Sequence, residues 1–164
     1  MSFVDLAVFL SIAAAVVCWS LSEARASRTL WAAGALLTLI HSVAAFGIFY
    51  GWSHETARRV TTEQTAALTG LEFSGGIYIN YAFIVVWLAD AAWWCLSPRS
   101  YAARPQAISL LVRGFIFFII FNGAVVFADG WARLIGIAST FLVLTAWSLR
   151  RSSRRGASIT AGSS

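Results

Sequence analysis

Three ionisable side chains, His41, Asp90 and Arg113, lie inside long apolar stretches of the 164-residue chain. An Asp or Arg at the centre of a membrane-spanning helix costs about 2.5–3.5 kcal/mol by insertion measurements. Such residues therefore usually pair with one another, or they line a path for a ligand or ion. Each of them is a candidate functional residue.

Asp90 and Arg113 are expected at matching depth on neighbouring helices. With a rise of ~1.5 Å per residue, each lies ~9 Å from the cytoplasmic end of its predicted helix. Consecutive helices joined by a short loop usually pack side by side, so an intramembrane ion pair is the simplest interpretation. Two alternatives stay open. The pair could relay a proton or bind a ligand, or Arg113 could snorkel to the interface and leave Asp90 neutral or paired elsewhere.

His41 is expected ~14 Å below the opposite, outer end of its helix, in the same half of the bilayer as Asn80 and Asn122. Asn80, Trp87 and Asp90 recur at helical spacing, which predicts a polar and aromatic face turned into the bundle. This face and the face of His41 together predict an inward-facing pocket that opens to the outside. His41 is interpreted as a hydrogen-bonded packing residue, a ligand of haem, metal or quinone, or a proton carrier.

The only long polar stretch, residues 51–76, adds Trp52 and His54 to the candidate ligand-binding residues, and Tyr78 follows directly after it. A set of carboxylates and histidines could bind a metal or perform acid–base chemistry. The spacing matches no zinc or di-iron pattern, so we predict no metal site and identify no cofactor. Ser53 is a suitable helix start, which favours the alternative of a short interfacial helix that closes the outer mouth of the pocket.

Membrane-spanning helices must position these residues. The chain is 59% hydrophobic and 12% charged, about half the charged fraction of a soluble domain. Apolar runs of about 20 residues, enough to cross a bilayer, recur along it. We therefore predict an all-α integral membrane protein, a single bundle of five transmembrane helices over residues 1–149, followed by a basic, disordered cytoplasmic tail at 150–164. The predicted spans are residues 3–21, 30–50, 77–96, 107–128 and 133–149.

The arginines determine the predicted orientation. The chain has no Lys, and most Arg residues fall on one side of the predicted bundle. Because positive charge collects on the cytoplasmic side, the topology is predicted to be N-out/C-in in the cell membrane, with residues 51–76 extracytoplasmic. The charge adjoins the ends of spans, so we expect contact with the lipid bilayer and not with nucleic acid. The residues on the predicted cytoplasmic side are Arg25, Arg28, Arg99, Arg104, Arg150, Arg151, Arg154 and Arg155, against Arg58, Arg59 and Arg133 on the other.

The aromatic-rich pocket and the lack of a complete catalytic set favour a ligand-binding or accessory subunit of a membrane complex. Such a subunit would hold an apolar small molecule, such as a quinone, lipid or carotenoid, or pack against other membrane subunits. The alternative is a membrane enzyme or proton-coupled transporter with a site in the outer half of the bundle. A homo-oligomeric structural protein is a third possibility.

Overall fold

The described part of the protein consists of helices joined by short turns. The computed structural model describes residues 3–161, with the side chains of residues 5–152, and no strand occurs among them. The elements in chain order are α1 (Phe3–Arg25), α2 (Arg28–Tyr50), α3 (His54–Thr69), α4 (Gly76–Leu96), α5 (Pro98–Ala102), α6 (Gln106–Phe121), the π-helical segment η1 (Asn122–Val126) and α7 (Gly130–Ala161).

Five helical stretches within the described residues are long and apolar enough to cross a membrane. Each has between 21 and 23 residues, and about 20 are needed for the hydrocarbon core of a bilayer. The prediction of an all-α protein with five candidate spans is thereby confirmed. The stretches are Asp5–Arg25, Arg28–Tyr50, Gly76–Leu96, Gln106–Val126 and Gly130–Ser152.

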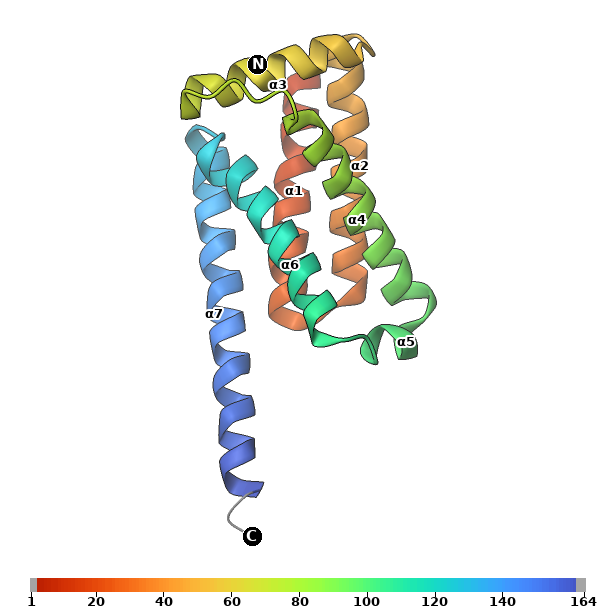
Figure 1. Ribbon diagram of the computed structural model, residues 1–164, viewed down its shortest axis with the longest axis vertical. Helices are drawn as coiled ribbons and strands as arrows, with labels where there is room; N and C mark the ends of the chain where they lie inside the picture. Colours follow the sequence, from red (N-terminus) through yellow and green to blue (C-terminus); the bar gives the residue numbers. More distant parts are fainter. Residues whose placement is uncertain (1–2, 162–164) are drawn as a thin grey trace.

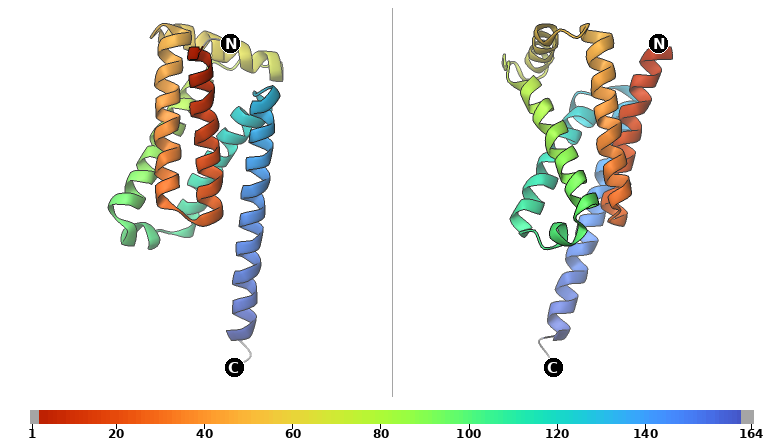
Figure 2. Two further views of the ribbon diagram at one scale, coloured as in Figure 1. Left: turned by 180° about the vertical axis from the view of Figure 1, so that it is seen from behind. Right: turned by 90° about the vertical axis from the view of Figure 1, so that its right-hand side faces the viewer.

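The helices are arranged around an antiparallel hairpin of α1 and α2. α7 packs on α1 and α4 packs on α2, while α6 crosses the opposite face between α4 and α7 (Figure 1). The two further views agree with this arrangement (Figure 2). Every candidate span thus has at least one neighbour from a distant part of the sequence.

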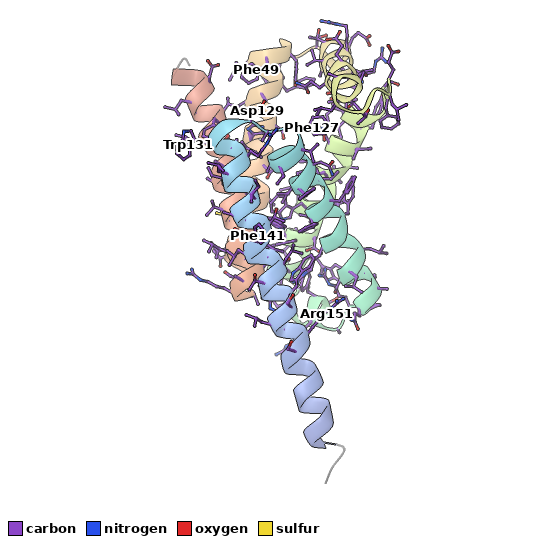
Figure 3. All side chains as sticks on the ribbon, turned by 90° about the vertical axis from the view of Figure 1, so that its left-hand side faces the viewer. Phe49, Phe127, Asp129, Trp131, Phe141 and Arg151 are labelled. Carbon is purple, nitrogen blue, oxygen red and sulfur yellow. The ribbon has the colours of Figure 1, made fainter. Side chains whose placement is uncertain are left out.

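The two ends of the bundle differ. α3 lies across the end that also holds the start of α1 and the turn between α6 and α7, whereas α5 and the α1–α2 turn lie at the opposite end (Figures 1 and 2). Asp129 and Trp131 lie at the first end and Arg151 lies toward the second (Figure 3). The halves of the bundle nearest these ends are called the α3 half and the α5 half below.

The residues at its ends explain why α3 is separated from α2 and α4 by turns. Ser53 adopts an extended conformation and its hydroxyl accepts a hydrogen bond from the Thr56 backbone N–H, which makes it the N-cap as predicted. Gly51 ends α2 with a φ of 55° and Gly70 ends α3 with a φ of 74°. Glycine adopts this left-handed conformation without steric cost, so the chain can turn sharply at both sites.

α7 differs from the expected end of the chain. It continues as a helix to Ala161, where a basic tail was predicted after residue 149. The four arginines that follow residue 149 favour helix, so the helix can continue past the end of the apolar run. Disorder of the tail stays a prediction, and residues 162–164 lie outside the described residues.

Two glycines allow helices to approach closely. A Cβ on Gly34 of α2 would lie 2.8 Å from Cζ2 of Trp87, and a Cβ on Gly136 of α7 would collide with the carbonyl oxygen of Ala124. The second contact involves η1, where the backbone widens from α-helical to π-helical hydrogen bonding. Such π-helical segments often occur at functional sites, and η1 borders the cavity described next.

Candidate functional site

A cavity of about 410 Å³ lies in the α3 half of the bundle. This volume falls within the range of small-molecule sites, about 300–1,000 Å³. The cavity is surrounded by α1, α2, α4, the α6–η1 region and the first turns of α7, and Thr61 of α3 also lines it. Among the described residues its lining is mostly aliphatic and aromatic, and it contains no Asp, Glu or Arg.

Some of the candidate residues from the sequence meet at this cavity. His41 from α2 and both Asn80 and Trp87 from α4 line it. The shared face predicted for Asn80 and Trp87 is the reason, because residues separated by two helical turns point the same way. Thr38, one turn from His41, joins them.

The His41 ring is held by α1. Its Nδ1 lies 3.0 Å from the Val8 carbonyl oxygen and 3.4 Å from the Ser11 hydroxyl. A carbonyl oxygen only accepts hydrogen bonds, so Nδ1 carries the proton in the neutral ring. The free lone pair of neutral His41 is then on Nε2, which leaves this nitrogen as a hydrogen-bond acceptor. Ser11 was not among the candidates, since nothing in the sequence specifies which helix His41 faces.

Trp87 and Thr38 carry polar atoms that lack partners. The side chains are 1% and 3% exposed, and neither Trp87 Nε1 nor Thr38 Oγ1 makes a hydrogen bond to any described residue. An unsatisfied buried donor or acceptor costs about 1–3 kcal/mol. Both residues line the cavity, so a molecule bound there could supply the missing partner.

The remaining candidates do not line the cavity. Trp52 is 66% exposed and packs edge-on against Phe46. Asn122 donates a hydrogen bond of 2.7 Å from its side-chain amide to the Phe118 carbonyl oxygen, one turn back in α6. Its role in the structure is local to the start of η1.

His54 and Tyr78 form a separate exposed cluster with Tyr81. His54 Nδ1 lies 3.1 Å from the Tyr81 hydroxyl, and its Nε2 lies 3.4 Å from the Tyr78 hydroxyl. These contacts join the first turn of α3 to the first two turns of α4. They hold α3 over the end of the bundle, and Tyr81 also lines the cavity.

The α5 half contains a buried ionic cluster around Asp90. Asp90 Oδ1 accepts a hydrogen bond from Arg104, and Oδ2 accepts bonds of 2.9 Å from both Trp31 Nε1 and the Tyr101 hydroxyl. The Asp90 and Arg104 side chains are each 3% exposed. The Arg104 guanidinium also lies over the Tyr101 ring, 3.8 Å from its centroid. The carboxylate is thus enclosed by donors.

A second ionic cluster surrounds Glu23, in the last turn of α1. Its Oε2 accepts hydrogen bonds of 3.1 Å from Arg113 Nη1 and 2.9 Å from Trp147 Nε1, and Arg150 lies 3.9 Å away. Arg150 also donates to the Glu23 backbone carbonyl. The cluster therefore connects α1, α6 and α7, while Glu23 Oε1 and Arg113 Nε have no partner among the described residues.

The predicted Asp90–Arg113 ion pair is therefore wrong. Asp90 pairs with Arg104 and Arg113 pairs with Glu23. Arg104 lies in the loop between the predicted third and fourth spans, and its long guanidinium side chain reaches back into the bundle from there. The predicted first span ends at residue 21, four residues before α1 ends at Arg25, and therefore leaves out Glu23.

Burial and the Asp90 charge raise the pKa of Tyr101 to about 12. The phenol therefore stays protonated and donates to Asp90 at physiological pH. Among the described residues, no group of three or more His, Cys, Asp or Glu side chains lies close enough together to hold a metal ion. The cavity and the two ionic clusters are consequently the chemical features that the described chain offers.

The five apolar helices define the chain as a multi-pass membrane protein. No protein-family model matches the sequence, and no curated protein or solved structure is significantly similar to it. The functional argument accordingly rests on the site itself.

Proposed function

We propose that this protein is a membrane-embedded ligand-binding protein, which holds an apolar small molecule in the cavity of the α3 half. The cavity supports the proposal by its volume of about 410 Å³ and its largely apolar lining. Small-molecule sites are typically apolar with a few polar groups that orient the ligand. His41, Thr38 and Trp87 are such groups, and two of them have buried polar atoms without partners.

The proposed orientation is N-out/C-in in the cell membrane, with a cytoplasmic C-terminus. It is supported by the arginines at the α5 end, among them Arg25, Arg28 and Arg99, since positive charge collects on the cytoplasmic side. α3 then lies at the outer membrane surface, where an amphipathic helix buries its apolar residues among the lipid head groups. The cavity belongs to the outer half of the bilayer in this orientation.

The ligand-binding class is favoured over an enzyme or a proton-coupled transporter by the positions of the charged residues. Asp90 and Arg113 each make an ion pair in the α5 half, away from the cavity. His41 is the only His, Asp or Glu among the described lining residues. A single histidine without a carboxylate or a second histidine at the cavity favours binding over acid–base catalysis.

A matched pair of glycine substitutions tests the proposal. A Cβ at Gly123, which lines the cavity, or at Gly114, which lies about two turns earlier on α6 and does not, would meet no atom within 4 Å. Gly123→Leu fills part of the cavity, whereas Gly114→Leu adds the same group outside it. Each variant is purified in mild detergent, and bound small molecules are identified by native mass spectrometry and by the absorption spectrum.

We expect the wild-type protein and Gly114→Leu to carry the same small molecule, and Gly123→Leu to lose at least about 90% of it, which corresponds to about 1.4 kcal/mol in affinity. Equal ligand content in both variants would contradict the proposal. So would a wild-type protein that purifies without any bound molecule and takes none up from a membrane lipid extract.

A further inference from the structure

The inner end of the cavity is marked by Trp87 Nε1 and Thr38 Oγ1, the buried atoms without partners. One belongs to α4 and the other to α2, so they come from different walls of the cavity. Asn80, two turns from Trp87 on α4, lies ~10 Å nearer the α3 end. The inner end is therefore distinct from the mouth.

The indole of Trp87 packs against α2. A Cβ on Gly34 would lie 2.8 Å from Trp87 Cζ2, which is two bonds from Nε1 in the indole ring. Thr38 follows Gly34 by one helical turn on the same face of α2. Trp87 and Thr38 thus line the cavity from two helices that pack against each other, and each carries a buried polar atom without a partner in the described chain.

The chemistry of the two groups defines what they can bind. An indole N–H only donates a hydrogen bond, and a hydroxyl can donate one as well. A carbonyl oxygen has two lone pairs and can accept from both at once. A ligand hydroxyl can accept from Trp87 Nε1 and donate to Thr38 Oγ1, but this leaves the Thr38 hydrogen without an acceptor, whereas a carbonyl oxygen accepts from both donors.

The charge of the lining restricts the ligand further. No Asp, Glu or Arg lines the cavity among the described residues, and the other lining side chains are mostly aliphatic or aromatic. A charged head group would have no counter-ion there, and burying an unpaired charge is strongly unfavourable. The ligand must be uncharged.

We infer that the ligand is a neutral, lipid-soluble carbonyl compound whose carbonyl oxygen accepts hydrogen bonds from Trp87 Nε1 and Thr38 Oγ1. This inference rests on the proposed function and adds the chemical class of the ligand. The apolar body of the molecule then occupies the part of the cavity nearer α3, against α1, η1 and α7. Among membrane lipids, quinones are rigid members of this class.

Two probes of the same tail length, one with carbonyl groups on its six-membered ring and one without, test the inference. One is a benzoquinone with a saturated alkyl tail, and the other is the alkylbenzene with the same tail. Each probe is titrated into the detergent-solubilised full-length protein, and binding is followed by native mass spectrometry. We expect the quinone to bind about threefold to tenfold more tightly for each hydrogen bond it forms.

Conservative substitutions then remove the donors one at a time. Trp87→Phe and Thr38→Val should each weaken quinone binding about threefold to tenfold, while binding of the alkylbenzene changes less than about twofold. The matched controls are Trp93→Phe and Thr140→Val, because neither side chain lines the cavity and both already have a partner, Ser100 for Trp93 and the Gly136 carbonyl for Thr140. The controls should leave both affinities unchanged.

The outcomes separate the inference from the proposed function. If both probes bind equally and Trp87→Phe has no effect on either, the cavity binds ligands without using the donors, so the inference is wrong and the proposed function stands. If neither probe binds the wild-type protein, both are wrong. If Trp87→Phe does not fold, the quinone affinity of Thr38→Val tests the inference by itself, because this substitution only replaces a hydroxyl group with a methyl group.

Discussion

The two halves of the bundle differ in the polar side chains that they bury. The α5 half contains two ionic clusters, in which Glu23 Oε1 and Arg113 Nε still lack a partner, whereas no Asp, Glu or Arg among the described residues lines the cavity of the α3 half. In the α5 half, Asp90 and Glu23 are enclosed by arginine, tryptophan and tyrosine donors, and these contacts join helices that are far apart in the sequence. In the α3 half, Trp87 and Thr38 line a cavity, and each has a buried polar atom without a partner from the described chain. The charged contacts that join distant helices thus lie in the α5 half, and the cavity lies in the α3 half.

This difference shows how a small membrane protein can hold a cavity open. Helices in a bilayer gain little from burying apolar surface against one another, so packing and polar contacts must hold them together. Glu23 and Asp90 provide such contacts at the α5 end of the bundle. The helices are therefore free to diverge toward α3, where the cavity forms.

The largest expected effect is the loss of Asp90. Asp90→Ala leaves the buried Arg104 guanidinium without its carboxylate, and breaking a buried pair costs about 3–5 kcal/mol. We expect the free energy of unfolding, measured by denaturation in detergent micelles, to fall by this amount. Asp129→Ala is the control, because the Asp129 side chain is 92% exposed in its pair with Arg133, and exposed pairs contribute about 0–1 kcal/mol. Equal losses in the two variants would contradict the comparison.

Double-mutant cycles sharpen the assignment of partners within the α5 half. We expect a coupling free energy of about 1–3 kcal/mol for Asp90 with Arg104 and for Glu23 with Arg113, because residues in one ionic contact couple to this extent. The cycle for Asp90 with Arg113 should give a smaller coupling than either ion pair, because among the described residues these two side chains share only Trp31, which donates to Asp90 and whose ring centroid lies 5.9 Å from the Arg113 guanidinium. A larger coupling in the third cycle than in the first would restore the pair expected from the sequence.

A smaller effect of opposite sign is expected in the α3 half. Thr38→Val removes a buried hydroxyl that has no partner, so the ligand-free protein should keep its stability or gain up to about 1 kcal/mol. The same change at Thr140 removes a hydrogen bond of 2.8 Å to Gly136, so about 0.5–1.5 kcal/mol should be lost. Unfolding curves of the two variants, recorded after extraction of bound molecules, provide the comparison. A clear loss in Thr38→Val would show that its hydroxyl already has a partner in the folded chain.

The smallest effect concerns the exposed end of α3. The hydrogen bond from Arg58, together with its charge, holds the pKa of Glu55 below the usual 4.5. A carboxyl with a lowered folded-state pKa adds stability above its unfolded pKa, and this contribution disappears as the pH falls through the folded value. The helix should therefore loosen slightly as the pH falls below 4.5, measured by amide hydrogen exchange in α3. Glu55→Gln should remove this acid dependence, and an unchanged dependence would assign it to another group.

The candidate spans and part of the cavity lining could be predicted from the sequence. Apolar runs of the length of a bilayer predict spans directly, and helical periodicity placed Asn80 and Trp87 on one face. His41 was recognised because an ionisable residue in an apolar run is unusual. These features depend on local sequence alone.

The partners of the charged residues could not be found in the same way. Depth along a helix matches Asp90 with Arg113, but the reach of the Arg104 side chain from beyond α5 depends on the tertiary structure. Glu23 was overlooked because the end of α1 was placed too early, and helix ends are the least certain part of such predictions. The charge balance of the predicted cytoplasmic side could have indicated these pairs. Glu23 and Asp90 are the only carboxylates on that side, where most of the arginines lie.

The aromatic rings between the two halves affect proton transfer through the bundle. Trp87 contacts Trp31 at 5.6 Å between ring centroids, Trp31 contacts Trp94 at 6.4 Å, and Trp94 stacks on Tyr101 at 4.8 Å. An indole N–H can give a hydrogen bond but cannot accept one, so a proton cannot hop along such a column. The column insulates the cavity from Asp90, and a molecule bound near α3 exchanges no protons with the α5 side along this route.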